Sequence, residues 1–87
     1  MTEMEKLEKG LKKLGIPYQK RKIFDGEQIV CGDWDVICHS FSYGGQFGLL
    51  EAMGNSIVGE DYKDDVEGFL TASKILKRLT NNANYDK

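Results

Sequence analysis

Apolar residues recur at helical spacing near the start of the chain, with charged residues between them. This stripe consists of Met4, Leu7, Leu11 and Leu14. Positions three and four apart share one face of a helix, and we expect this face to pack on a sheet. Thr2 and Glu5 form a capping-box pattern at its start. Gly15 and Pro17 stop it, so the pattern predicts a helix over residues 3–14.

Shorter runs of alternating character follow, as is typical of strands. Two of them, residues 18–24 and 27–31, flank an Asp-Gly dipeptide, which favours a tight hairpin turn. A two-residue loop would pair Ile23 with Gln28, whereas a three-residue loop with a bulge would pair Ile23 with Ile29. We expect the bulged form, because it gathers apolar residues on one face of the hairpin.

A third strand is predicted for residues 34–41. Alternation places Trp34, Val36 and Cys38 on one face, which we expect to meet the core. Residues 47–53 are compatible with a helical turn or with a fourth strand. The bounding glycines and the shortness of the run favour the strand.

The stretch 54–68 holds turn residues and then acids, and we expect it to be mostly irregular, with its acidic part, 60–67, as a solvated loop. The last helix has two candidate starts. The earlier one, capped by aspartates, would put Gly68 in the helix interior, at a cost of about 1 kcal/mol. We therefore expect the helix to begin after Thr71 and residues 81–87 to form a frayed polar tail.

These elements predict an α+β fold. It comprises an N-terminal helix, an antiparallel meander of three or four strands, and a C-terminal helix, in a single domain over residues 1–80. A chain of 87 residues builds only one small core, so a surface groove or loop is a better candidate site than a deep enclosed pocket.

The composition argues against several classes of function. A net charge of −2 argues against a nucleic-acid binder that works by neutralising phosphates. The basic run at residues 20–22 favours an edge strand protected by lysines, and weak nucleic-acid binding through this run is an alternative. No apolar run approaches the roughly 20 residues of a membrane span, and with only two cysteines we expect the reducing cytoplasm.

The residues with reactive side chains form no catalytic pattern. Cys31, Cys38 and His39 lack the spacing of a zinc site, and adjacent strand residues point to opposite faces. Asp35 and His39 share a strand face but lie roughly 13 Å apart. We therefore expect no catalytic residue, no metal and no cofactor, and a protein that is not an enzyme.

The best candidate for a site is the loop between the third and fourth strands, where aromatic and polar residues surround two glycines. The candidate binding residues are Ser42, Tyr43, Gly44, Gly45, Gln46, Phe47, Glu51 and Tyr62. Aromatic side chains are the usual anchors of protein interfaces when they are exposed, and Trp34 is a further candidate anchor. The glycines match neither a P-loop nor a dinucleotide fingerprint, although loop amides could meet an anion.

Several short segments carry a resemblance to a class of uncharacterised open reading frames. They are residues 14–18, 24–26, 42–45, 48–54 and 68–72, which span most of the chain. Their order resembles that of short frames in prophages and mobile elements of Gram-positive bacteria. The chain departs from this pattern at Ser73 and Lys74, where acidic residues are expected. The resemblance implies an accessory protein of a phage or mobile element, and no particular activity.

Three functions remain open from the sequence. The leading one is a small intracellular, non-enzymatic protein that binds a host or phage protein and inhibits a host function. The second is a small-ligand or nucleotide-binding protein that uses residues 42–46. The third is the weak nucleic-acid binder. A homodimer is also open, and we expect no membrane association.

Overall fold

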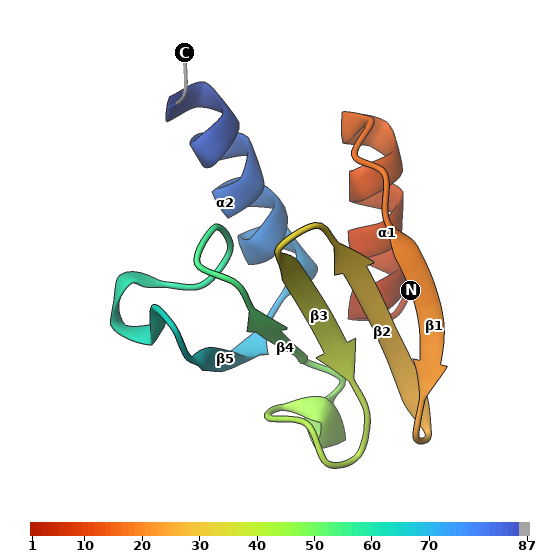
Figure 1. Ribbon diagram of the computed structural model, residues 1–87. Coiled ribbons are helices and arrows are strands. Elements are labelled where there is room, and N and C mark those ends of the chain that lie inside the picture. Colours follow the sequence, from red (N-terminus) through yellow and green to blue (C-terminus); the bar gives the residue numbers. More distant parts are fainter. Residues whose placement is uncertain (86–87) are drawn as a thin grey trace.

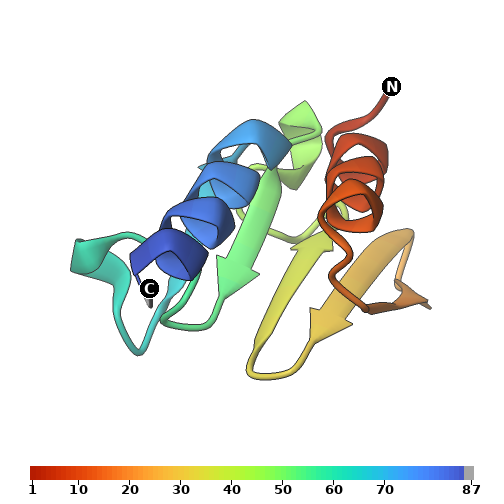
Figure 2. The ribbon, with the colours of Figure 1, turned by 90° about the horizontal axis from the view of Figure 1, so that it is seen from above.

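Two helices pack on one face of a five-stranded antiparallel sheet in this computed structural model, which describes residues 1–85 (Figures 1 and 2). The elements are α1 (Glu3–Leu14), β1 (Gln19–Ile23), β2 (Gly26–Cys31), β3 (Trp34–Cys38), η1 (Gly45–Phe47), β4 (Leu50–Met53), η2 (Glu60–Tyr62), β5 (Val66–Leu70) and α2 (Ala72–Tyr85). The strand order β1-β2-β3-β4-β5 is a simple meander, so the predicted α+β class is confirmed.

Helix α1 has the predicted bounds and the predicted cap. Thr2 Oγ1 accepts from Glu5 N at 3.1 Å, and Thr2 N donates to Glu5 Oε1 at 2.8 Å. Gly15 ends the helix with a φ of 73°, which is the left-handed conformation that glycine adopts readily. Leu14 does not reach the core and stays half exposed at the end of the apolar stripe.

The predicted register of the first hairpin is wrong. Ile23 pairs with Gly26 and not with Ile29, and Lys20 lies opposite Ile29. The apolar face of the hairpin accommodates Lys20 without a bulge. The Lys20 ammonium is paired there, since it lies within 3.2 Å of Glu8 and 3.0 Å of Glu27. Strand β1 is an edge strand, as its lysines indicated.

The sheet has five strands, whereas three or four were predicted. The additional strand is β5, most of which lies in the stretch that was expected to be irregular. Leu50 of β4 pairs with Leu70, but Ala52 pairs with Glu67, so β5 carries one extra residue at this point. The irregularity includes Gly68 and Phe69, and it breaks the alternation from which a strand is recognised. Strand β4 agrees with the predicted fourth strand.

Helix α2 begins directly after Thr71, as predicted. Lys74 N donates to Thr71 Oγ1 at 3.3 Å, and Ala72 N donates to Glu3 Oε1 of α1 at 2.7 Å. This backbone hydrogen bond, together with Lys6, holds the pKa of Glu3 below its usual value. Of the predicted frayed tail, residues 81–85 continue α2, and residues 86–87 lie outside the described chain.

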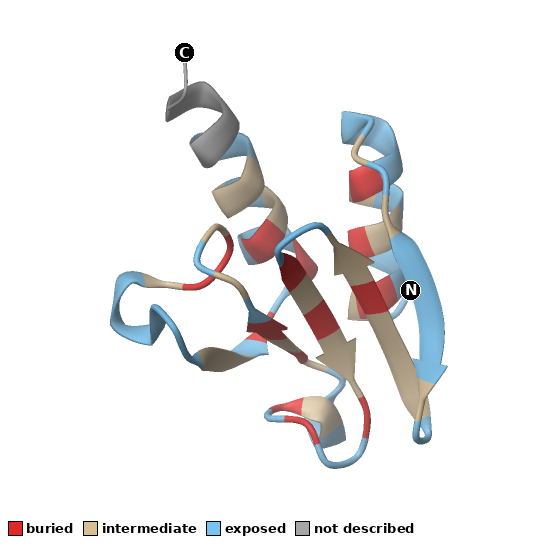
Figure 3. Cartoon of the chain, in the orientation of Figure 1, coloured by how far each residue is buried: buried red, intermediate tan, exposed pale blue. Residues whose placement is uncertain are grey.

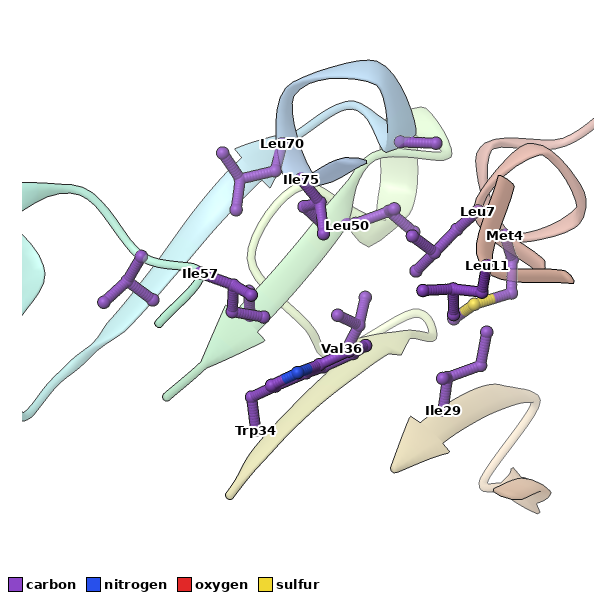
Figure 4. Close-up of a cluster of buried hydrophobic side chains, with 13 residues drawn as sticks. Met4, Leu7, Leu11, Ile29, Trp34, Val36, Leu50, Ile57, Leu70 and Ile75 are labelled. Carbon is purple, nitrogen blue, oxygen red and sulfur yellow. The ribbon is translucent and has the colours of Figure 1, made fainter. Parts of the chain in front are cut away.

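The core lies between the helices and the covered face of the sheet (Figures 3 and 4). Leu7 and Leu11 of α1 and Ile75 of α2 are fully buried, and they meet Ile29 and Val36 of the sheet. The core also contains Met4, Trp34, Leu50, Ala52, Leu70, Ala72 and the loop residues Ile57 and Val58. Both α-helices of the described residues lie on this one side of the sheet (Figure 2).

Candidate functional site

The loop that joins β3 to β4 is held by its own backbone. Four amides between Gly45 and Leu49 donate to carbonyl oxygens of the same loop at 2.9–3.0 Å. The glycines are part of this packing, since a Cβ on Gly45 would lie 1.8 Å from the carbonyl oxygen of His39. The loop is therefore a preformed platform whose amides are largely occupied.

The Ser42 side chain stabilises this loop through hydrogen bonds to the His39 backbone. It is buried, and its hydroxyl accepts from His39 N at 3.0 Å and donates to His39 O at 2.8 Å. The His39 ring is also tied down, because Nδ1 accepts from Phe41 N at 3.1 Å. Ser42 and His39 are thus structural residues, and the buried Ser42 hydroxyl, which the predicted binding role would use, is already engaged.

Replacing Ser42 with alanine is expected to lower the free energy of unfolding by about 1–2 kcal/mol. The change leaves the buried His39 N–H without its acceptor, and a lost buried partner costs about this much. Urea unfolding followed by circular dichroism measures the difference. Ser40→Ala is the control, since the Ser40 side chain is exposed and its hydrogen bond to the Asp25 carboxylate is open to solvent. An equal loss in both variants would contradict the role of the Ser42 hydroxyl.

Tyr43 and Glu51 join the loop to the neighbouring strands. Tyr43 N donates to Glu51 Oε1 at 2.8 Å, and Phe69 N of β5 donates to Tyr43 O at 3.2 Å. Glu51 therefore contacts the predicted site, but as a carboxylate that holds a loop amide. A negative charge at this position makes the loop a poor receptor for an anion.

Exposed aromatic side chains gather around this loop. They are Phe24 (76% exposed), Phe41 (80%), Tyr43 (60%), Phe47 (74%) and Phe69 (59%). We call this set the aromatic end. Its members come from the β1–β2 turn, from the β3–β4 connection and from β5, which meet at one end of the sheet (Figure 1).

Ring contacts link four of these side chains in two pairs, and one hydrogen bond joins two of the segments that carry them. The ring centroids of Phe24 and Phe41 are 6.1 Å apart, and those of Phe47 and Phe69 are 6.4 Å apart. Asp25 Oδ1 accepts from Ser40 N at 3.0 Å, which ties the β1–β2 turn to the next loop and lowers the pKa of Asp25. These contacts order the rings without covering them.

Two of these residues have a strained backbone conformation. Phe24 has a φ of 55° and Phe69 a φ of 58°, in the left-handed region that residues with a Cβ seldom adopt. This conformation costs roughly 1–2 kcal/mol per residue. An exposed ring gives the core little in return, so the fold alone does not explain why phenylalanine occupies either position.

A cavity of about 390 Å³ opens beside the aromatic end, between the start of α1 and the β1–β2 turn. Its lining includes Met4, Phe24, Glu27, Cys38 and Gly48. Burial raises the pKa of the Cys38 thiol, so this group is a neutral, weakly polar wall. The cavity has the size of a receptor for one or two side chains of a partner.

The structure brings together some of the predicted site residues and separates others. Tyr43, Phe47 and Glu51 lie at the aromatic end, with the glycines between them, and Gln46 is exposed on η1. Tyr62 lies on η2, which is apart from η1 in both views (Figures 1 and 2). Trp34, a candidate anchor, is buried in the core.

Sequence reasoning missed three of the five rings, namely Phe24, Phe41 and Phe69. Alternation assigns a phenylalanine to the core or to a strand face and does not detect one at a turn. A usable signal was present at Phe24, which directly precedes the Asp-Gly dipeptide of a hairpin turn, where polar residues are usual.

The cysteines and acidic side chains that the sequence singled out lie apart from one another or are engaged in the sheet. No group of three or more metal-ligating side chains occurs within residues 1–85. Burial raises the pKa of the Cys31 thiol as it does that of Cys38, which disfavours the nucleophilic thiolate. Asp35 Oδ2 accepts a hydrogen bond from Gln28 Nε2 of the neighbouring strand at 2.9 Å.

Comparison of the chain with protein-family models, with curated proteins and with solved structures gave no match. The resemblance to prophage reading frames therefore stays a prediction. Within the described part of the chain, neither helix is long and apolar enough to cross a membrane.

Proposed function

We propose that this chain is a non-enzymatic binding protein whose aromatic end docks on an apolar surface of a protein partner. The observation that carries the proposal is the pair of exposed phenylalanines, Phe24 and Phe69, at positive φ. Backbone strain of this kind is found where recognition requires a side chain that the fold does not. Through the resemblance to prophage frames, the partner would be a host or phage protein.

The chemistry of the aromatic end fits this role. Its rings are large apolar anchors of the kind that dominate binding energy at protein interfaces. The hydrogen-bonded loop beneath Phe47 and the ring contact to Phe69 hold them in place before binding, which limits the entropy lost on association. The cavity beside Phe24 adds a recess for a partner side chain.

A double variant, Phe24→Asn with Phe69→Asn, separates binding from folding. Asparagine tolerates positive φ better than phenylalanine, so we expect the free energy of unfolding to stay level or to rise by up to about 1 kcal/mol. We expect the same change to abolish binding. The measurement is stoichiometric capture from a lysate of the organism that carries the gene, followed by titration of the purified partner.

Met53→Thr is the matched control for that experiment. Met53 is an exposed apolar residue on β4, outside the aromatic end, and its replacement should leave capture intact. Capture of one partner by the wild-type protein and by Met53→Thr, but not by the double variant, supports the proposal. Equal capture by all three proteins would exclude the aromatic end as the binding surface.

The second candidate, a nucleotide or small-anion binder at residues 42–46, has less support from the geometry. The Ser42 hydroxyl and the Tyr43 amide are already engaged, and Glu51 places a carboxylate against the loop. A nucleotide at 100 times its Kd would add about 2.7 kcal/mol of stability, and a thermal-shift screen that shows this would revive the candidate.

Nucleic-acid binding through residues 20–22 also has little support. Lys20 pairs with two carboxylates, and Arg21 Nε donates to Gln28 Oε1 at 2.8 Å. Within residues 1–85, this leaves Lys22 as the cation of the run without an ion pair or side-chain hydrogen bond. A steep dependence of DNA or RNA retention on salt would be needed to support this function.

A further inference from the structure

We propose that the groove between α1 and α2 is a second docking site, and that it receives an acidic amphipathic helix of a protein partner. The groove is a shallow depression of about 510 Å³ lined by residues of both helices. It does not depend on the function proposed for the aromatic end.

The floor of the groove is apolar because one glycine lets the helices meet closely. A Cβ on Gly10 would lie 2.3 Å from Leu76 Cδ1, so the Leu76 side chain of α2 packs directly on the α1 backbone at Gly10. Gly10 costs about 1 kcal/mol in helix propensity relative to alanine. Ala72 and the half-exposed Leu14 extend the apolar floor toward the two ends of the groove.

The charged residues that line the groove are all lysines. Lys6 and Lys13 come from α1, and Lys77 comes from α2. Lys6 lies 3.0 Å from Glu3, whereas Lys13 and Lys77 form no ion pair with any residue that the structure describes. A chain with a net charge of −2 therefore carries a locally cationic groove.

This combination selects one kind of occupant. An apolar floor between two helices accepts the apolar stripe of a third helix, as ridges fill grooves. Lysines along the rim complement carboxylates on the flanks of that helix. A phosphate backbone would leave the apolar floor unfilled, and a flat membrane surface would not enter the groove, so both fit this shape less well.

The test uses a fluorescein-labelled synthetic helix of roughly 16 residues, about 24 Å long. Its leucines stand at helical spacing and its remaining positions are mostly glutamate. One comparison peptide has lysine in place of each glutamate, and another has the same residues in scrambled order. Fluorescence anisotropy at about 0.15 M salt, where charges are screened beyond about 8 Å, gives the affinity of each peptide.

The decisive variant is Lys13→Glu with Lys77→Glu, and the matched control is Lys9→Glu with Lys12→Glu. Both pairs change the net charge equally, but Lys9 and Lys12 do not line the groove. We expect the first variant to raise the Kd of the acidic peptide at least about tenfold. The Kd measured with the control variant should stay within about twofold of the wild-type value. Circular dichroism checks that both variants are folded.

Other results would overturn the proposal. Equal binding of the acidic and scrambled peptides would mean that the groove recognises no amphipathic helix. If both charge-reversal variants weakened peptide binding equally, the peptide would be responding to the overall charge of the protein and not to the groove. Sedimentation that shows wild-type self-association, lost in the groove variant, would assign the groove to a second copy. Displacement of the peptide by duplex DNA would assign it to nucleic acid.

Discussion

Replacing Gly45 with alanine is expected to lower the free energy of unfolding by about 3 kcal/mol. The added Cβ would lie 1.8 Å from the carbonyl oxygen of His39 and 2.5 Å from Ser42 Oγ. The first of these atoms belongs to the backbone and cannot rotate away, so the loop must move as a whole. Overpacking of this kind typically costs about 1–3 kcal/mol. We expect the cost at Gly45 to lie near the upper end of this range.

The same substitution should disturb the aromatic end. Displacing the loop at Gly45 moves Phe47, which follows two residues later, relative to Phe69. Urea unfolding measures the stability, and partner capture measures the binding. We therefore expect the loss of binding and the loss of stability to occur together in this variant, unlike in the asparagine double variant.

Gly48→Ala is the control for Gly45→Ala. Gly48 has a φ of 73°, and no atom lies within 4 Å of a Cβ built there. Its replacement should cost only the backbone strain, roughly 1–2 kcal/mol. If Gly45→Ala were no more destabilising than this control, the close packing of the loop against His39 would be contradicted.

The elements that periodicity describes well were predictable, and their particular residues show why. Helix α1 combines an apolar stripe with a capping box at Thr2 and a glycine stop, and all three signals agree on one helix. Strand β3 alternates regularly, and Val36 and Trp34 are buried as expected. Local sequence and tertiary packing act in the same direction in both cases.

The failures have a common physical cause, which is a local rule overridden by a distant contact. Lys20 lies on the helix-facing side of β1 because Glu8 of α1 neutralises it, and nothing near Lys20 in sequence reveals this partner. Strand β5 is hidden by the irregularity at Gly68 and Phe69. A Cβ on Gly68 would lie 2.2 Å from Tyr43 Cβ, so the loop and the strand are packed against each other.

The candidate site was predictable to a similar degree. The sequence singled out the β3–β4 loop as a candidate site, and Tyr43 and Phe47 are exposed there. The contributions of Phe24 and Phe69 depend on where the β1–β2 turn and β5 lie in space. Tertiary structure alone brings Phe69 against Phe47 and Phe24 against Phe41.

Replacing Glu67 with glutamine is the second change that we expect to be strongly destabilising, at about 2–3 kcal/mol near pH 7. Glu67 Oε1 accepts from Arg78 Nη1 and from Gly59 N, each at 2.7 Å, and Arg78 Nη1 also donates to Ile57 O at 3.0 Å. The pair ties α2, β5 and the 54–65 connection together. Glu67 is thus not part of a solvated loop, which corrects that prediction for the acidic stretch.

The pH dependence of this effect follows from the pKa of Glu67. Burial alone would raise this pKa, but the Arg78 guanidinium and the Gly59 amide outweigh it and lower the pKa below its usual value. A depressed pKa in the folded state means that ionised Glu67 stabilises the fold above the pKa of the unfolded carboxyl, about 4.3. This stability is lost as the pH falls through the folded pKa.

Urea unfolding of the wild-type protein and of Glu67→Gln at a series of pH values measures this contribution. The difference between the two proteins should be largest near neutral pH and should shrink as the pH falls below about 4. Glu60→Gln is the control, because the Glu60 side chain is 87% exposed and its contact with Lys63 is long, at 3.6 Å. That variant should match the wild-type protein throughout. A difference for Glu67→Gln that stays constant down to low pH would show that side-chain shape, rather than the charge on Glu67, holds the 54–65 connection against α2.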